Sequence, residues 1–189
     1  MKKITAPGIC LRACESEDAD VFAAVVRESV ATVGRWMGWC HAEFNSDHAR
    51  DWFAACDKAR EEATAFEFGI FSEDGKVLLG GAGLNMISKL HNYCNLGYWI
   101  RQSSQGQGIA TRAAILLANA GFRELGFNRI EIVAAEANVN SIAVAKKLGA
   151  QLECMARNRL MVGGVPVTAA VHSLLREDWQ ASLTYDVQK

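Results

Sequence analysis

One segment constrains this chain more than any other, because in it an apolar strand leads directly into a glycine-spaced turn and then a helix. It reads Leu96-Gly97-Tyr98-Trp99-Ile100-Arg101 and continues through Gln102-Ser103-Ser104-Gln105-Gly106-Gln107-Gly108 to Ile109-Ala110. The first N–H groups of a helix have no partner inside it and lie at the positive end of the helix dipole. Such a junction is a typical site for an anion such as a pyrophosphate. We therefore expect a phosphate-bearing ligand here, with an ordinary polar turn as the alternative.

Two common phosphate loops do not fit this segment. A nucleoside-triphosphate loop needs Gly-Lys-Ser/Thr after its glycines, but Gly108 is followed by Ile109 and Ala110. A dinucleotide fingerprint needs Gly-x-Gly-x-x-Gly, and the stretch that starts at Gly106 ends on Thr111 instead. The pattern that remains is Gln-x-x-Gly-x-Ala, from Gln105 to Ala110.

Composition sets the broad class. The length of 189 residues, with 50% apolar and 22% charged residues, fits one globular domain over residues 1–189. A net charge of −1 argues against direct binding of nucleic acid through a broad basic face. The six cysteines include no Cys-x-x-Cys pair and have no histidine at metal-ligand spacing, so we expect a reducing, cytoplasmic location and no metal. We also expect no signal peptide and no membrane span.

Hydrophobic periodicity and turn residues predict eleven elements in the order β-α-α-β-β-β-α-β-α-β-β. The strands are expected at residues 8–13, 65–71, 77–87, 95–101, 129–134, 151–161 and 166–176, and the helices at 16–29, 46–63, 108–125 and 138–148. The fold class is therefore α/β (α+β), with helices flanking a mixed, mostly antiparallel, seven-stranded sheet. Glycines at positions 80, 81 and 83 indicate a close approach by a ligand or by another backbone.

A second motif, Asn138-Val139-Asn140-Ser141, opens the helix after strand 129–134. By itself it reads as a helix cap. Together with the glycine loop, it resembles the GCN5-related N-acetyltransferases (GNAT). A closer resemblance, to the RimJ/RimL branch, is carried by Trp36-Met37-Gly38-Trp39, by Leu96-Gly97-Tyr98-Trp99-Ile100 and by Asn138-x-x-Ser141. It covers roughly residues 8–179.

This resemblance implies a donor site for acetyl-CoA. In this fold, strands four and five of the seven, at 95–101 and 129–134, splay apart, and the pantetheine arm of the co-substrate lies between them. The pyrophosphate would be bound by Gln105, Gly106, Gln107, Gly108, Ile109, Ala110 and Thr111. An N–H near Ile100 would polarise the acetyl carbonyl, and Asn138 would hydrogen-bond the pantetheine arm. Many relatives have a thiolate-protonating tyrosine where this chain has Ala145, so Ser141 is the expected proton donor.

The acceptor is harder to derive. The RimJ/RimL branch acetylates protein N-termini, including those of ribosomal proteins. An α-amino group has a pKa near 7.7–8.0 against about 10.4 for lysine, so it needs less help from a base. Asn95 and Leu160 stand where some relatives have carboxylates, which leaves the base unassigned. Glu28 and the weaker candidate Tyr98 are therefore considered both as bases and as substrate-lining residues.

The expected wall of the acceptor site is the tryptophan segment, with Trp36 and Trp39 as substrate-binding residues, against core packing as the alternative. An excess of acidic residues in the first half of the chain suits a cationic partner. Three functions stay open: acetylation of a protein or peptide N-terminus, acetylation of a small amine such as a polyamine, amino acid or antibiotic, and acyl-CoA binding without turnover. Relatives are often homodimers, so a homodimer is also considered.

Overall fold

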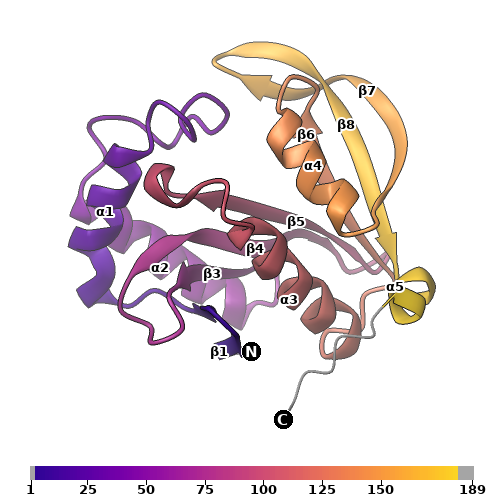
Figure 1. The fold of residues 1–189 in the computed structure, drawn as a ribbon, viewed down its shortest axis with the longest axis horizontal. Coiled ribbons are helices and arrows are strands. Elements are labelled where there is room, and N and C mark those ends of the chain that lie inside the picture. The colour runs from indigo at the N-terminus through magenta and orange to yellow at the C-terminus, as the bar shows by residue number, and fades with distance from the viewer. Residues whose placement is uncertain (1–2, 183–189) are drawn as a thin grey trace.

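The computed structural model describes residues 3–182, which form one eight-stranded sheet with helices on both faces (Figure 1). The strands are β1 (Lys3–Ala6), β2 (Ile9–Arg12), β3 (Phe66–Phe71), β4 (Leu78–Ser88), β5 (Tyr93–Ile100), β6 (Arg129–Ala135), β7 (Gln151–Val162) and β8 (Val165–Leu175). The α-helices are α1 (Ala19–Glu28), α2 (Ser46–Glu61), α3 (Ile109–Arg123), α4 (Val139–Lys147) and α5 (Arg176–Ser182). Short 3₁₀ turns lie at Ser16–Asp18 and Gln102–Ser104. The spatial order of the strands is β1-β2-β3-β4-β5-β6-β8-β7.

The sheet opens between β5 and β6, as expected for strands 95–101 and 129–134. This is the one parallel pair among the described strands, and it pairs only Tyr93–Asn95 with Arg129–Glu131. Beyond Asn95, β5 stays paired with β4 on its other side, up to Ile100. The two halves of the sheet diverge there, and Figure 1 shows β6, β7 and β8 rising away from β5. The predicted mixed, mostly antiparallel and splayed sheet is confirmed.

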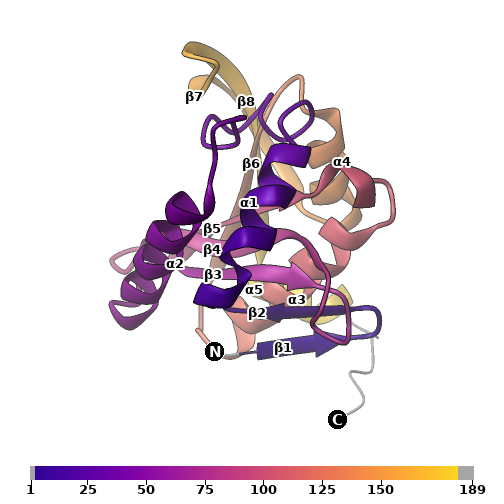
Figure 2. The ribbon, with the colours of Figure 1, turned by 90° about the vertical axis from the view of Figure 1, so that its left-hand side faces the viewer.

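Two apolar cores hold the helices on the sheet. One core lies between α3 and the face formed by side chains such as Phe68, Leu84 and Leu96. The other lies under α1 and α2, where Phe22, Phe53 and their neighbours pack against β2 and the ends of β3 and β4. Figure 2 shows α2 and α4 on opposite sides of the sheet. The sheet, with the opening between β5 and β6, therefore lies between the α3 and α4 layer and the α1 and α2 layer.

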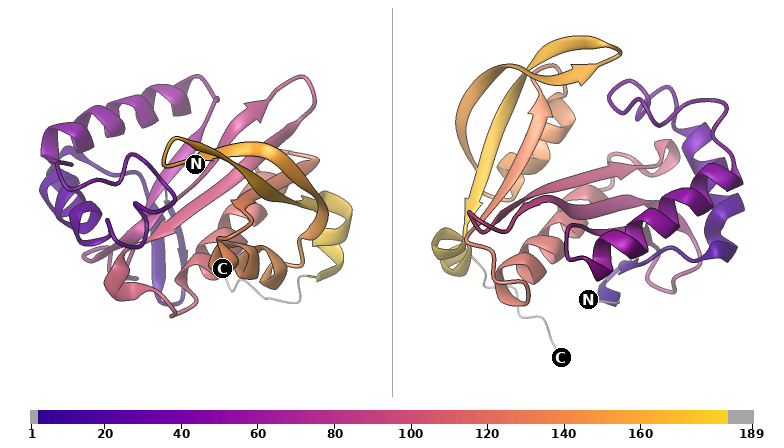
Figure 3. Two further views of the ribbon diagram at one scale, coloured as in Figure 1. Left: turned by 90° about the horizontal axis from the view of Figure 1, so that it is seen from above. Right: turned by 180° about the vertical axis from the view of Figure 1, so that it is seen from behind.

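The loop after α1 and the tip of the β7–β8 hairpin rise on either side of this opening (Figure 3). The loop comprises residues 29–45, and it contains the Trp36–Trp39 segment. Backbone hydrogen bonds such as Met37 N–H to the Val33 carbonyl (3.0 Å) give it a series of tight turns. It is therefore an ordered wall of the opening rather than part of α1 or α2.

Two elements differ from the sequence prediction. The first strand predicted, 8–13, is the second strand of a hairpin in which Ala6 pairs with Ile9, so the sheet has eight strands and not seven. The strand β1 is an edge strand of four residues, and its alternation of Ile4 and Ala6 with Lys3 and Thr5 is too short to distinguish a strand from a turn. The second difference is α5, a helix that the sequence did not predict, which follows directly after the last strand ends at Leu175. No helix within residues 3–182 is both long and apolar enough to cross a membrane.

Candidate active site

The turn before α3 presents a row of backbone N–H groups. Gly106 (φ 77°) and Gly108 (φ 73°) adopt the left-handed conformation, and Gly108 caps α3 without a side-chain hydrogen bond. The N–H groups of residues 106–111 donate to no group within the described chain, residues 3–182. A Cβ at Gly106 would meet nothing within 4 Å, so glycine is required there by the backbone angle and not by crowding. Unpaired donors at the positive end of a helix are the groups with which proteins bind anions, so this turn is the candidate anion site.

Two neighbouring side chains shape this turn. Gln105 Nε2 donates to the Ile100 carbonyl (3.0 Å) and to Thr32 Oγ1 (3.1 Å), and the Gln105 N–H faces the Gln102 carbonyl (3.4 Å). Gln105 therefore holds the turn in place, and its own N–H is not among the free donors that the sequence suggested. Arg112 was missed from the sequence; its Nη1 donates to the Gln107 carbonyl (3.2 Å) and adds positive charge beside the turn.

Glu28 lies at the end of α1 and is bound to the start of the same turn. Its carboxylate forms an ion pair with Arg101 and accepts the Ser103 N–H (2.9 Å). The hydrogen bond from Arg101 and the contacts with Ser103 lower the pKa of Glu28 to about 2. A carboxylate of such low pKa is a poor proton acceptor at neutral pH. This geometry argues against the general-base role considered for Glu28 and indicates an anchor between α1 and β5.

Tyr98 and Ser141 meet across the opening between β5 and α4. Tyr98 Oη lies 3.0 Å from the Ser141 carbonyl oxygen and 3.1 Å from Ser141 Oγ. Because a phenol has one proton, this arrangement lets Tyr98 donate to the carbonyl and accept from the serine hydroxyl. Burial raises the pKa of Tyr98 to about 12, so the phenol stays protonated at neutral pH. This protonation state argues against Tyr98 as a base.

The start of α4 is organised by Asn138. Its side-chain oxygen accepts the Ser141 N–H (3.2 Å), which is the N-cap that the sequence predicts. The cap holds Ser141 in the first turn of α4, where it faces β5. Ala145, the position of the tyrosine in many relatives, is fully buried in the core.

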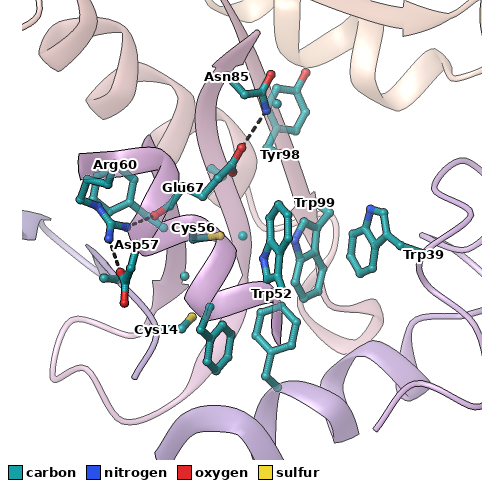
Figure 4. Close-up of a pocket in the computed structure, with 18 of the residues that line it drawn as sticks. Cys14, Trp39, Trp52, Cys56, Asp57, Arg60, Glu67, Asn85, Tyr98 and Trp99 are labelled. Atoms are coloured by element: carbon teal, nitrogen blue, oxygen red, sulfur yellow. Dashed lines mark hydrogen bonds and ion pairs between the residues drawn. The ribbon is translucent and has the colours of Figure 1, made fainter. Parts of the chain in front are cut away.

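A cavity of about 350 Å³ lies on the other face of β5, under α1 and α2 (Figure 4). Its walls come from seven parts of the chain, and the aromatic residues among them include Phe22, Trp39, Phe44, Trp52, Phe53 and Trp99. Trp39 contacts Trp99 edge-on, with ring centroids 5.4 Å apart. Trp36 is not among the lining residues, and its ring lies under the Arg35 guanidinium instead. Of the two tryptophans expected in the acceptor wall, the cavity therefore contains Trp39 and not Trp36.

The cavity has a polar floor that the sequence analysis missed. Glu67 Oε1 accepts from Asn85 Nδ2 (2.8 Å), and Asn85 Oδ1 accepts from Asn95 Nδ2 (2.9 Å). Gly83 makes room for this chain, because a Cβ there would collide with the Glu67 carboxylate. Burial raises the pKa of Glu67, although the Asn85 hydrogen bond and the Arg60 charge act against it.

The sequence does contain a signal for this floor. Glu67 is an acid within the otherwise uncharged strand Phe66–Phe71, and it pairs with Gly83 in the run of glycines on β4. The predicted close approach to these glycines exists: Gly83 is approached by the Glu67 carboxylate, Gly81 by the Trp99 ring and Gly80 by the Trp99 backbone. The neighbours are therefore protein atoms, from β3 and β5. No group of three or more His, Cys, Asp or Glu residues that could hold a metal occurs within residues 3–182.

The family of this chain follows from comparison with known proteins. Residues 9–151 match the model of the acetyltransferase (GNAT) domain, and the chain belongs to this family of N-acetyltransferase enzymes. This result agrees with the splayed sheet and the glycine turn described above. It favours an enzyme over the acyl-CoA-binding module considered from the sequence.

The relatives point to one branch of the family. The chain is 30% identical, over 91% of its length and 93% of the relative's, to YdaF of Bacillus subtilis (strain 168), whose name assigns it provisionally as a ribosomal N-acetyltransferase. A Vibrio cholerae structure, described provisionally as a ribosomal-protein-serine acetyltransferase, is 30% identical with a TM-score of 0.81, covering 93% of this chain and 99% of that one. RimL, a ribosomal L7/L12 acetyltransferase in complex with coenzyme A, shares the fold at 20% identity, with a TM-score of 0.83 over 91% and 96% of the two chains.

Proposed function

We propose that this protein transfers the acetyl group of acetyl-CoA to the α-amino group at the N-terminus of a protein or peptide. The observation that carries the proposal is the row of unpaired N–H groups at residues 106–111, next to the open edge of β5. Ribosomal proteins are the first acceptors to test, because YdaF and the Vibrio cholerae protein are both named for them. The six free cysteines support a reducing, cytoplasmic location.

The donor side fits acetyl-CoA in three respects. The N–H groups of residues 106–111, with Arg112 beside them, suit a pyrophosphate. Beyond Asn95, alternate backbone groups of β5 face the opening without a strand partner and can pair with the pantetheine amides. A β5 N–H near Ile100 would then polarise the thioester carbonyl. Acetyl-CoA supplies an activated acyl group, and Asn138 would contact its pantetheine arm.

Ser141 is the proposed proton donor to the departing thiolate. Its hydroxyl lies at the opening, 3.1 Å from Tyr98 Oη, so each hydroxyl can replenish the proton of the other. Tyr98 is kept protonated by its raised pKa, so it can hydrogen-bond Ser141 as a neutral phenol. We assign the acid role to Ser141 and a supporting role to Tyr98.

A small amine is the second candidate acceptor. The cavity of about 350 Å³ lies at the lower end of the range for small-molecule sites, and its walls are aromatic. A compact cationic amine could occupy it whole, whereas a peptide would insert only its N-terminal residue. The sequence-derived preference for an α-amino group rests on its lower pKa, and the cavity accommodates either class.

A panel of acceptors separates these candidates. Peptides with free serine, alanine or methionine N-termini would be incubated with acetyl-CoA beside lysine peptides with blocked N-termini, polyamines and free amino acids. We expect CoA release with the free N-terminal peptides, and a mass increase located at the first residue. Acetylation of small amines alone would replace the peptide proposal by the second candidate, and no turnover on any amine would contradict both.

A homodimer is also proposed. The β7–β8 hairpin carries exposed apolar side chains at Leu152, Met155, Met161 and Val165, and β7 is an edge strand of the described sheet. Exposed apolar edges of this kind pair readily with another copy of the chain. Light scattering at several concentrations, with Met161→Lys as the matched variant, tests the assembly; a concentration-independent monomer mass would contradict it.

A further inference from the structure

We propose that Glu67 is the catalytic base of the reaction and receives the amine of the acceptor at the floor of the aromatic cavity. This inference rests on the proposed function, since it assumes an amine acceptor and a thioester donor. It assigns the removal of a proton from the amine. Neither earlier candidate suits this step, because Glu28 is paired with Arg101 and Tyr98 stays protonated.

The first support is the free carboxylate oxygen. Glu67 Oε1 is occupied by Asn85, but Oε2 accepts no hydrogen bond from any group within residues 3–182. Glu67 lines the cavity together with Gly97 and Asn85, and Figure 4 shows its carboxylate reaching from β3 toward Asn85. The side chain lies over Gly83, whose missing Cβ leaves room for it. An amine in the cavity would therefore find an acceptor oxygen that is not already paired.

The second support is the position of this oxygen relative to the donor side. Gly83 lies between Glu67 on β3 and Gly97 on β5 in the strand register, so all three project toward the same face of the sheet. The segment Gly97–Trp99 lines the cavity, and it belongs to the part of β5 that has no β6 partner. The cavity and the proposed thioester site therefore share β5. Glu67 lies on β3, and only β4 separates β3 from β5.

The third support is the electrostatic environment. A carboxylate that must take a proton near neutral pH needs a pKa above its ordinary value, and burial acts on Glu67 in this direction. Asn85 and Arg60 limit the rise; Arg60 Nη2 donates to the Glu67 backbone carbonyl (2.7 Å), and its Nη1 is paired with Asp57. The other titratable groups that line the cavity are Cys14, Cys56 and Tyr98, and burial raises the pKa of each. Asp57, the second carboxylate among the lining residues, is paired with Arg60.

The proton balance is complete with these groups. The bound ammonium gives one proton to Glu67 Oε2, and the neutral nitrogen attacks the thioester carbon. The C–N bond forms, the C–S bond breaks, and the thiolate takes its proton from Ser141. The hydroxyl is restored by the second proton of the former amine, and Glu67 returns its proton to solvent.

The test compares wild type with Glu67→Gln. Glutamine keeps the size of the side chain and an oxygen for Asn85, so the variant removes the base and preserves the hydrogen bond. We expect kcat/KM for an N-terminal peptide to fall by about 100-fold at neutral pH, with the Kd of acetyl-CoA unchanged. Glu61→Gln, at an exposed position near the end of α2, is the matched control and should keep full activity.

A second acceptor distinguishes a base from a residue that only shapes the cavity. An aminooxyacetyl peptide has a nucleophile that is unprotonated at neutral pH, so it needs no base before attack. We expect Glu67→Gln to lose much less activity with this acceptor than with the ordinary peptide. Equal losses with both acceptors, or unchanged activity with the peptide, would overturn the assignment. An inactive wild type would contradict the proposed function instead.

Asn85→Ser provides an independent measurement if Glu67→Gln does not fold. The Asn85 hydrogen bond lowers the pKa of Glu67, so its removal should raise that pKa. Because the base must be deprotonated, kcat/KM rises with pH through the pKa of Glu67. The acid limb of the profile should therefore move to higher pH in Asn85→Ser. An acid limb that stays at the wild-type position would contradict the role of Glu67.

Discussion

The proposed donor side and the proposed acceptor side of the opening are built in different ways. The donor side, residues 100–111 and 138–141, consists mainly of backbone N–H groups and of short-range caps such as Asn138 to Ser141. The proposed acceptor side is the aromatic cavity, whose walls come from the segment after β2, from α1, α2 and the loop between them, and from β3, β4 and β5. A backbone site depends on a few local residue choices, whereas a side-chain site depends on many long-range contacts. A sequence motif can therefore specify the donor side. The residues of the acceptor side can change, and with them the acceptor, without changing that motif.

The largest effect is expected where the two sides meet. Ser141→Ala removes the proposed proton donor, and we expect kcat to fall by about 100-fold, while the Kd of acetyl-CoA stays within about twofold. Rapid-quench or steady-state CoA release measures the first, and calorimetric titration the second. Tyr98→Phe keeps the ring and should cost less than Ser141→Ala; a larger loss in Tyr98→Phe would reverse the two roles.

A second prediction breaks the donor side without touching the cavity. Gly106→Val forces a β-branched residue into the left-handed region, at a cost of about 1–2 kcal/mol or more. Because this backbone presents the anion site, the Kd of acetyl-CoA should rise by about tenfold or more. Gly75→Val is the matched control, since Gly75 has the same φ of 77° and also has nothing within 4 Å of its missing Cβ.

The control outcome separates strain from function. Both glycine variants should lower the free energy of unfolding by a similar amount, measured by urea titration. Only Gly106→Val should weaken acetyl-CoA binding, because Gly75 lies in the turn between β3 and β4 and not among residues 106–111. Equal affinities in the two variants would show that residues 106–111 do not bind the donor.

A third prediction breaks the acceptor side alone. Trp39→Ala removes an aromatic wall of the cavity, so the KM of the acceptor should rise several-fold, while the KM of acetyl-CoA should not change. Trp36→Ala, in the same loop but outside the cavity, is the matched control. Initial rates at varied concentrations of each substrate provide both constants. A larger acceptor effect from Trp36→Ala would mean that peptides bind along the outer surface of the loop.

The smallest effect concerns the anchor that joins the two sides. Glu28→Gln should cost about 1 kcal/mol of stability at neutral pH, since its partner Arg101 stays partly exposed to solvent. The folded-state pKa of Glu28 is about 2, below its ordinary value of 4.5. Its contribution is therefore present above pH 4.5 and is lost as the pH falls toward 2. Urea unfolding between pH 3 and pH 7 should show a shallower acid loss in Glu28→Gln than in wild type.

The same variant checks whether Glu28 acts as a base. An anchor leaves the shape of the pH–rate profile between pH 6 and pH 9 unchanged and alters only its height. The disappearance of an ionisation from that profile would return the base role to Glu28 and would weaken the assignment to Glu67.

The sequence predicted much of the fold and one half of the site. Residues Leu96–Ala110 and Asn138–Ser141 are contiguous, and their geometry is set by glycine, by capping and by strand periodicity, which are local properties. The edge strand β1 was missed because its alternating pattern spans only four residues. Glu28 was considered as a base because the sequence does not reveal its partner Arg101, 73 positions away.

The sequence by itself determined the family and the turn that is proposed to receive the donor, because both depend on neighbours in the chain, and the splayed sheet was implied by the family resemblance. The tertiary structure alone decided the acceptor side. It brought Glu67 over Gly83 and hydrogen-bonded it through Asn85 to Asn95, it selected Trp39 and left Trp36 outside, and it held Tyr98 against Ser141. The physical reason is that burial, ion pairing and pKa values depend on which side chains from distant parts of the sequence come into contact. A local sequence pattern does not specify those contacts.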